Sequence, residues 1–487
     1  MMTKTRSRED RISGADRVLD GLLFALFVFL YFFIFNKYSL VGFTREPGDF
    51  VFNDMFLRLL SGDFAIDRSV IGDEAYVRAG RTYAYFGIVP ALARIVFWPF
   101  LDLRTTSVSS IVCTVLAFVT SCVNFATLQL SQGFPKQRAL RQGLLFCTFF
   151  AGLPFYLVAR HSTYVESALW ALMFAAIYIH VFVKGFAGAQ ATGRGLWLLA
   201  ALAGLCLNTR VTTGLTLSLG VSALVLSRVW EGGKPPRMRE AAPALRTSLV
   251  ACAVLSLFLM LAFFVNDRRW GNFLEFADLK RQTFQIHAHP ERLTILLKYG
   301  LFNPDRLAFG LQYYFLPVWG LFGPDGHSVL NPFMLQQMHG AEFPPSSFFL
   351  TDAVYVWMIG LWLLGVIRRG GAAPVEAGRR ESAGSLGQIV AFAPVPLLML
   401  THIYMALRYR IEFFPLLFFA AWLAFDRLGS DAFWRRRQWV ALALVAVSVL
   451  ASVLTLWLGY IAMGPTTELN FPHAYQHALS LLSPGGA

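Results

Sequence analysis

Charged residues are scarce in this sequence. Only 15% of the 487 residues are charged and 56% are hydrophobic, with a mean hydropathy of +0.54. A soluble globular protein has about 25% charged residues, so this composition excludes an ordinary soluble domain. The apolar residues come in long blocks separated by short polar loops, which is the pattern that a bilayer imposes. The composition therefore predicts one continuous helical membrane domain.

Cysteine is also rare, and its placement excludes two kinds of site. The chain has five cysteines, all inside apolar blocks, and none of them belongs to a CxxC pair. They are Cys113, Cys122, Cys147, Cys206 and Cys252. We interpret them as small buried hydrophobic residues and not as a disulfide framework or a metal site.

The N-terminus lacks the features of a cleaved signal peptide. Residues 1–19 are polar and basic, and the apolar run Leu19–Leu40 is too long for a signal-peptide core and has no clear cleavage site. We expect an uncleaved first helix with the N-terminus in the cytoplasm. The sequence also contains no repeat of fixed period.

The formal net charge of +13 does not point to nucleic acid. Nucleic-acid binding would need a basic face interleaved with exposed aromatic residues, and the sequence shows none. Lys and Arg instead mark the cytoplasmic loops of a membrane protein. The 46 Phe, 16 Tyr and 12 Trp suit lipid-facing surfaces and interfacial belts, so the expected partner is the lipid bilayer.

The apolar blocks predict an all-α, polytopic transmembrane bundle of about eleven spans with short helices on its periplasmic side. The predicted spans are 19–40, 106–130, 142–159, 164–184, 194–208, 211–228, 247–266, 351–367, 386–406, 411–425 and 438–463. Phe86–Leu101 contains Arg94 and two prolines and fits an interfacial or re-entrant helix. Leu307–Phe322 fits a second such helix or half of an extra hairpin.

Basic residues alternate from loop to loop and give the orientation. Six segments rich in Lys and Arg fall on one side, which the positive-inside rule makes cytoplasmic. The opposite side receives a first outer loop, 41–105, and a second outer segment, 267–350. We therefore predict a bundle over residues 1–463 in the plasma (inner) membrane, with a C-terminal tail, 464–487, on the outer side.

Three short turns on the predicted outer side carry arginine and so oppose the charge bias of the other loops. Their polar residues, with those that open the following spans, are Arg160, His161, Tyr164, Glu166, Asn208, Arg210, Arg408, Tyr409, Arg410 and Glu412. Each has a simpler interpretation, because an arginine can snorkel to the headgroups, a glutamate can pair with an arginine, and His161 can be structural. Together they predict a phosphate-bearing lipid as ligand, since arginine forks bind phosphate.

The first outer loop begins with acidic residues. Glu46, Asp49 and Asp54 lie just after the first predicted span. A carboxylate held at the membrane surface among apolar residues can take a proton from an acceptor hydroxyl, and a solvated loop of ordinary acidic content is the alternative. The same stretch predicts an amphipathic helix, whose apolar face comprises Phe52, Met55, Phe56, Leu59 and Leu60.

Four stretches resemble the GT-C superfamily of integral membrane glycosyltransferases, which use sugars carried on polyprenyl phosphate or pyrophosphate. They are Glu46–Asp49 leading into Met55–Gly62, Tyr83–Pro90 with Trp98–Phe100, Tyr164–Glu166 after Arg160, and Arg408–Pro415. The resemblance implies that Asp49 is the general base, with Glu46 and Asp54 as rivals. It also implies that Arg210, Arg408 and Arg410 engage the lipid phosphate.

The resemblance also bears on cofactors and on the branch of the superfamily. It implies no required cofactor; some relatives use a divalent metal, but no cluster of metal ligands is compelling in this sequence. An adjacent acidic pair beside the first span is missing, and the nearest, Asp73-Glu74, lies further out. A large soluble outer domain is also lacking, which favours a compact monosaccharide transferase over an oligosaccharyltransferase.

The leading hypothesis is transfer of a sugar from a polyprenyl-phosphate donor to a hydroxyl of a glycan, lipid or protein acceptor at the non-cytoplasmic face. A transporter or lipid flippase is the alternative, and it predicts charges near mid-membrane and internal symmetry. The span interiors are almost free of charge and show no half-repeat. A ligase or acyltransferase acting on the same class of lipid is a third hypothesis, with His161 as its candidate residue.

Overall fold

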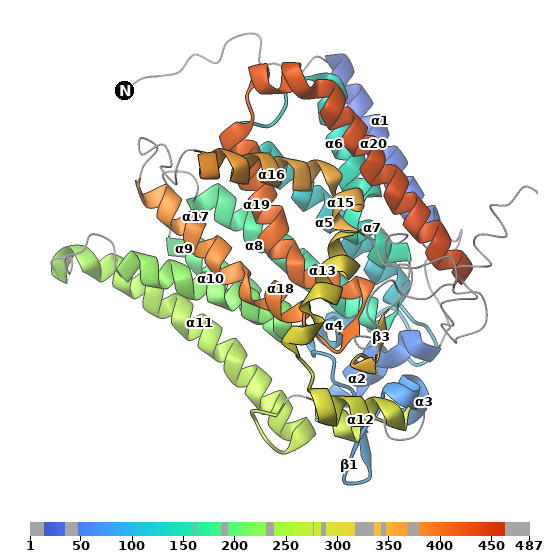
Figure 1. The fold of residues 1–487 in the computed structure, drawn as a ribbon. Helices are drawn as coiled ribbons and strands as arrows, with labels where there is room; N and C mark the ends of the chain where they lie inside the picture. The colour runs from blue at the N-terminus through green and yellow to red at the C-terminus, as the bar shows by residue number, and fades with distance from the viewer. Residues whose placement is uncertain are drawn as a thin grey trace, which may run out of the picture.

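The structure is a computed structural model that describes residues 14–34, 47–159, 162–186, 193–229, 238–275, 277–283, 289–316, 336–341, 347–368 and 379–462. These residues form an all-α fold with two very small sheets, and a helix coincides with each predicted span (Figure 1). The helices concerned are α1 (Gly14–Ile34), α5 (Ser109–Gln129), α6 (Arg138–Phe150), α7 (Gly152–Ala159), α8 (Thr163–Phe186), α9 (Gly193–Leu207), α10 (Val211–Val229), α11 (Met238–Trp270), α16 (Ala353–Arg368), α17 (Arg379–Phe392), α18 (Pro394–Met399), α19 (Phe414–Leu428) and α20 (Asp431–Ala462).

Among the described residues, five helical stretches are long and apolar enough to cross a membrane. They are Ser109–Gln129, Arg138–Val158, Thr163–Gly185, Leu245–Trp270 and Asp431–Leu456. Shorter apolar helices accompany them in α1, α9, α10, α16 and the α17–α18 stretch. The prediction of a multi-pass, all-α membrane protein is confirmed.

Two predicted spans are interrupted. The stretch 142–159 divides into α6 and α7 next to Gly152, whose φ of +72° lies in the region that favours glycine. The stretch 386–406 divides at Pro394, which cannot donate a helical hydrogen bond, and its helical part ends at Met399. The chain then forms β4 (Tyr404–Met405), which pairs in parallel with β3 (Gly340–Ala341).

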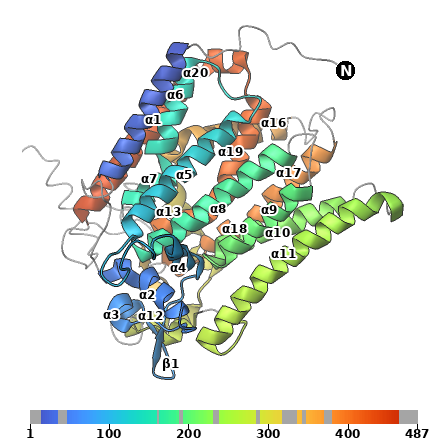
Figure 2. The same cartoon turned by 180° about the vertical axis from the view of Figure 1, so that it is seen from behind.

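Helix α8 lies inside the bundle. It packs against α5, α9 and α19, and buried small residues on it, Ala168, Ala171 and Ala175, allow those helices to approach closely. The candidate spans in α11 and α20 are only 17% and 22% buried, so most of their surface is available to lipid. Figures 1 and 2 show α11 along one edge of the bundle.

One end of the bundle carries most of the short elements, and we call it the loop-rich end (lower part of Figure 1). The first outer loop forms η2 (Pro47–Phe50), α2 (Val51–Leu59), α3 (Arg68–Ile71), η3 (Gly72–Glu74), β1 (Tyr76–Arg78), β2 (Arg81–Tyr83), α4 (Val89–Leu92) and η4 (Ala93–Val96). The described parts of the second outer segment form η5 (Leu279–Arg281), α12 (Pro290–Tyr299), η7 (Pro304–Arg306), α13 (Leu307–Phe315) and α15 (Phe348–Thr351). Strands β1 and β2 pair antiparallel, with Tyr76 opposite Tyr83.

The two ambiguous stretches are short helices. Phe86–Leu101 contains α4 and η4, which are far too short to cross a bilayer. The described part of Leu307–Phe322 contains the nine-residue helix α13. In α2, Phe52, Met55 and Phe56 are buried as predicted, but Leu60 is 53% exposed because the helix ends before it.

The first outer loop meets the turn between α9 and α10 at Gly87. A Cβ atom on Gly87 would lie only 2.1 Å from the carbonyl oxygen of Asn208. The backbone N–H of Val89 donates to the same oxygen at 3.3 Å. Backbone therefore packs directly on backbone here, and the contact fixes the loop against the bundle.

We expect Gly87→Ala to destabilise the protein by about 1–3 kcal/mol, because the added methyl group forces two backbone segments apart. The midpoint of thermal unfolding in detergent measures the loss. Gly360→Ala in α16 is the matched control, since no atom lies within 4 Å of the Cβ position there. Equal midpoints for the two variants would contradict the steric argument.

Candidate functional site

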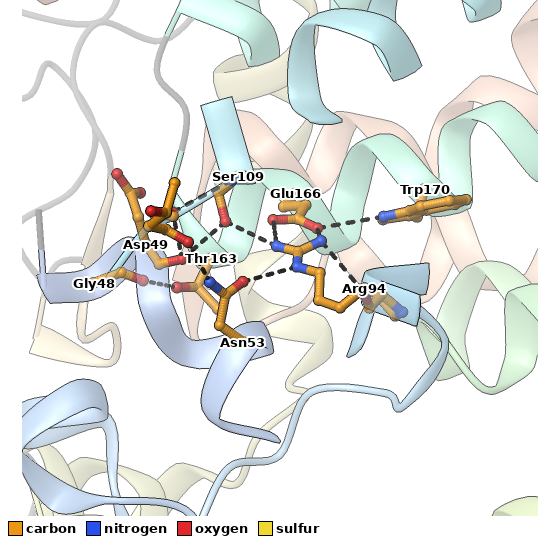
Figure 3. Close-up of polar contacts among 11 residues, drawn as sticks. Gly48, Asp49, Asn53, Arg94, Ser109, Thr163, Glu166 and Trp170 are labelled. Carbon is orange, nitrogen blue, oxygen red and sulfur yellow. Dashed lines mark hydrogen bonds and ion pairs between the residues drawn. The ribbon is translucent and has the colours of Figure 1, made fainter. Parts of the chain in front are cut away.

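A buried ion pair joins the first outer loop to the bundle (Figure 3). The Arg94 guanidinium in η4 forms a two-pronged pair with the Glu166 carboxylate in α8, and Nη2–Oε2 is 2.7 Å. Arg94 Nε donates to Asn53 Oδ1 at 3.0 Å, and Nη2 donates to Ser109 Oγ at 3.0 Å. Both charged side chains are fully buried, so each satisfies the other in a place without water.

Asp49 lies beside this ion pair. It is 4% exposed, and its backbone carbonyl accepts hydrogen bonds of 2.9 Å from the hydroxyls of Ser107 and Ser109. The carbonyl of the preceding Gly48 accepts a 2.5 Å hydrogen bond from the Thr163 hydroxyl at the start of α8. Figure 3 shows Asp49 close to Ser109 and Thr163, so α5 and α8 together hold this residue in place.

The two rivals of Asp49 have different positions. Asp54 accepts a 2.9 Å hydrogen bond from Arg58 one turn along α2 and another of 2.8 Å from the Asp67 backbone N–H. Its carboxylate therefore ties α2 to the chain that follows. Glu46 lies outside the described residues.

Two of the predicted arginines gather with tyrosines at the loop-rich end. The Arg408 guanidinium carbon lies 4.5 Å from the centre of the Tyr164 ring and 5.3 Å from that of Tyr409. The Arg210 guanidinium carbon lies 5.5 Å from the centre of the same Tyr409 ring. Such cation–π contacts hold a guanidinium in position without cancelling its charge. We call Glu74, Tyr85, Tyr164, Arg210, Arg408 and Tyr409 the tyrosine–arginine cluster; all six side chains are half-buried.

Arg210 is oriented by a buried carboxylate. Its Nε donates to Glu412 Oε1 at 2.6 Å, and the hydroxyls of Thr212 and Thr213 donate to the same carboxylate at 2.6 and 2.8 Å. The two terminal nitrogens of Arg210 donate no hydrogen bond to another residue within the described part of the chain. One edge of the guanidinium is thus fixed and the other can bind an anion.

Arg410 does not join the other two arginines. It is fully buried, donates to Asp352 Oδ2 at 2.6 Å and to the Thr351 hydroxyl at 2.9 Å, and stacks 3.9 Å from the centre of the Phe348 ring. Arg410 and Asp352 line a cavity of about 50 Å³ between α5, the α6–α7 break, α16 and α19, which also includes Asn124. The 3₁₀ helix η9 (Leu407–Phe413) therefore places Arg408 and Arg410 in different surroundings.

The structure brings Tyr164, Arg210 and Arg408 together, and it pairs Glu166 and Glu412 with arginines. Arg160 and His161 lie outside the described residues, as does the tail 464–487. The sequence analysis noted Arg94 in the stretch 86–101 but assigned it no role, although a charge within an apolar stretch was a usable signal. It also gave no role to Glu74, although Asp73 and Glu74 form the only adjacent acidic pair in the sequence of the first outer loop.

His402 packs against the cluster as a neutral group. Its ring lies 5.2 Å from that of Tyr409, and its Nδ1 is 2.8 Å from the Tyr404 carbonyl. Burial lowers the pKa of His402 to about 4, and the positive charges of Arg306 and Arg408 act in the same direction. At neutral pH the positive charge of the cluster therefore comes from its arginines. Among the described residues, no group of three His, Cys, Asp or Glu side chains is placed to hold a metal ion.

We expect Arg94→Met and Glu166→Met each to destabilise the protein by about 3–5 kcal/mol, because each leaves an uncompensated buried charge. The double variant should lose much less than the sum, since it buries no charge. Unfolding of all four proteins in detergent gives the coupling energy as a double-mutant cycle. Strictly additive losses would show that the two side chains do not act as a pair.

Comparisons with known proteins give similarity in overall arrangement only. No family model matches the chain, and no curated protein matches it. The chain is similar to the oligosaccharyltransferase AglB from Archaeoglobus fulgidus in complex with an inhibitory peptide and a dolichol-phosphate, with a TM-score of 0.49, 12% identity, and coverage of 97% of this chain and 59% of that one. It is also similar to ArnT from Cupriavidus metallidurans bound to undecaprenyl phosphate, with a TM-score of 0.43, 13% identity, and coverage of 96% and 70%. This chain thus spans less than two thirds of the archaeal enzyme, and the assignment of its site rests on its own residues.

Proposed function

We propose that this protein is a GT-C-type membrane glycosyltransferase. It transfers a sugar from a polyprenyl-phosphate donor to an acceptor hydroxyl at the non-cytoplasmic face of the plasma membrane. The observation that supports this most directly is the placement of Arg210 and Arg408 at the same end of the bundle as the buried Asp49. The link between them is short, because Thr163 contacts Gly48 and the next residue, Tyr164, carries Arg408 on its ring.

The arginines provide a site for the lipid phosphate. Arg210 is held at one edge by Glu412 and presents its terminal nitrogens, and Arg408 rests on aromatic rings. Preorganised cations in a half-buried position stabilise charge that grows on a leaving phosphate, and they need no rearrangement during the reaction. Arg410 and Glu166 take no part in this phosphate site, because they pair with Asp352 and Arg94 in the interior.

Asp49 is the proposed general base. It takes the proton of the acceptor hydroxyl, whose oxygen then forms a bond to the anomeric carbon of the sugar. The bond from that carbon to the phosphate oxygen breaks, its electron pair stays on the phosphate, and polyprenyl phosphate leaves. Of the two rivals, Asp54 is already engaged by Arg58 and by the backbone of Asp67, which favours Asp49 over it.

The sidedness follows from the distribution of charge. The helix ends opposite the loop-rich end carry basic residues, such as Arg138 at the start of α6, Lys184 near the end of α8 and the run Arg435–Arg437 near the start of α20. By the positive-inside rule, this distribution supports a cytoplasmic N-terminus and an outer position for the tyrosine–arginine cluster. A glycan, a lipid or a protein hydroxyl can serve as acceptor there.

The transporter or flippase alternative needs ionisable groups along a path through the membrane. Among the described residues, Arg94 pairs with Glu166, Arg210 with Glu412 and Arg410 with Asp352. The buried Arg269, at the end of α11, donates to the Phe86 carbonyl at the loop-rich end. This arrangement favours a site at one end of the bundle over a path across it.

We expect Asp49→Asn to lower kcat by roughly 10²–10⁴-fold, the range typical for loss of a general base. Binding of undecaprenyl phosphate should remain, because the arginines are intact. Transfer in purified membranes from a panel of radiolabelled lipid-phosphate sugars measures the rate, with Asp54→Asn as the matched control. Full activity of Asp49→Asn would rule out this base.

We expect Arg210→Lys to weaken binding of undecaprenyl phosphate roughly tenfold or more, because a charge-assisted hydrogen bond contributes about 1.5–3 kcal/mol. Lysine keeps a positive charge near Glu412 but removes the planar fork. Direct binding to the detergent-solubilised protein measures the affinity, and Arg104→Lys, at an exposed position of the first outer loop, is the control. Unchanged affinity in Arg210→Lys would remove Arg210 from the phosphate site.

A further inference from the structure

Glu74 is a carboxylate that the proposed reaction does not yet use. It ends η3, is half-buried, and accepts a 2.6 Å hydrogen bond from Gln282 Nε2. The backbone around it is clamped, because Tyr76 pairs with Gln282 and Thr283 donates to the Ala75 carbonyl at 2.8 Å. The second outer segment therefore fixes the position of Glu74.

Tyrosine rings separate Glu74 from the arginines. Tyr76, two residues after Glu74, has its ring 5.8 Å from that of Tyr85, and Tyr164 carries Arg408 at 4.5 Å from the centre of its ring. Tyr85 borders the group, with its ring 6.3 Å from that of Tyr164, and it interacts electrostatically with Glu74, Arg408 and Arg210. Burial raises the pKa of Tyr85 above its usual value, so its hydroxyl is neutral at physiological pH.

The carboxylate keeps capacity for further hydrogen bonds. An ionised carboxylate offers about four acceptor positions, and Gln282 uses one of them. Within the described chain no salt bridge joins Glu74 to an arginine or a lysine. This distinguishes it from Glu166 and Glu412, whose oxygens are held by an arginine in the interior.

The chemistry of a lipid-phosphate sugar fits this arrangement. A sugar whose phosphate is bound by Arg210 and Arg408 must lie directly beside these two arginines. Its hydroxyl groups are hydrogen-bond donors, which a carboxylate accepts, and its C–H face packs on an aromatic ring. Glu74 with Tyr164 and Tyr85 supplies both, whereas the backbone carbonyl of Asp49 is held by Ser109 in the neighbouring buried network.

We propose that Glu74 binds hydroxyl groups of the transferred sugar and thereby helps to determine which sugar the enzyme accepts. This assignment rests on the proposed function and gives the two carboxylates separate tasks. Asp49 receives the acceptor proton, and Glu74 holds the donor sugar. Gln282 is a positioning residue, because it acts through Glu74.

The test compares lipids with and without a sugar. Binding of undecaprenyl phosphate and of undecaprenyl phosphate hexosides and pentosides is measured on the full-length protein in detergent, for wild type and Glu74→Gln. We expect Glu74→Gln to weaken the tightest sugar-bearing lipid about tenfold, in line with the loss of one charge-assisted hydrogen bond, and to leave sugar-free lipid unchanged. Glu291→Gln, on the exposed face of α12, is the control.

Gln282→Leu provides a second variant that retains the carboxylate. We expect it to weaken the same sugar-bearing lipid by a smaller factor and to leave the sugar-free lipid unchanged. If Glu74→Gln weakens both lipids equally, or neither, the sugar role is wrong while the phosphate site stands. If wild-type protein binds no member of the panel, the proposed function and this assignment fail together.

Discussion

The buried pair of Arg94 and Glu166 is the interaction on which the loop-rich end depends. Neither charge can remain in the interior alone, so the two must meet, and meeting brings η4 onto α8. Arg94 also donates from Nε to Asn53 in α2 and from Nη2 to Ser109 in α5, which adds two more elements to the same point. Ser109 also holds the carbonyl of Asp49. One guanidinium thus positions the first outer loop, and with it the candidate base.

The other arginines also differ according to which carboxylate lies within hydrogen-bond distance of each. Glu412 holds Arg210 at one edge only, and Asp352 holds Arg410 inside the bundle. Arg408 rests on tyrosine rings, which fix its position through weak attraction and leave its charge intact. The result is a cluster whose positive charge is held in place before any ligand arrives, which is the condition for effective stabilisation of a leaving phosphate.

Two long segments of the chain cooperate at this end. The first supplies Asp49 and Glu74, and the second contributes Gln282, which orients Glu74. Their contact at the bridge between Tyr76 and Gln282 joins residues more than two hundred positions apart in the chain. Such contacts between distant segments bring hydrogen-bond donors and acceptors together at the loop-rich end.

The sequence by itself determined the membrane fold and the location of the spans, because hydrocarbon accepts only long apolar helices and the chain shows them plainly. It also singled out Tyr164, Arg210 and Arg408, since arginines on short turns opposed the charge pattern. The tertiary structure alone decided how each charge is used. Sequence spacing does not reveal which carboxylate reaches which arginine. Only the fold shows that Arg94 pairs with Glu166 and that Glu74 lies at the loop-rich end. Only the fold shows, too, that Arg408 and Arg410 have different surroundings. A buried charge takes the nearest partner in space, and nearness in space is a property of the fold.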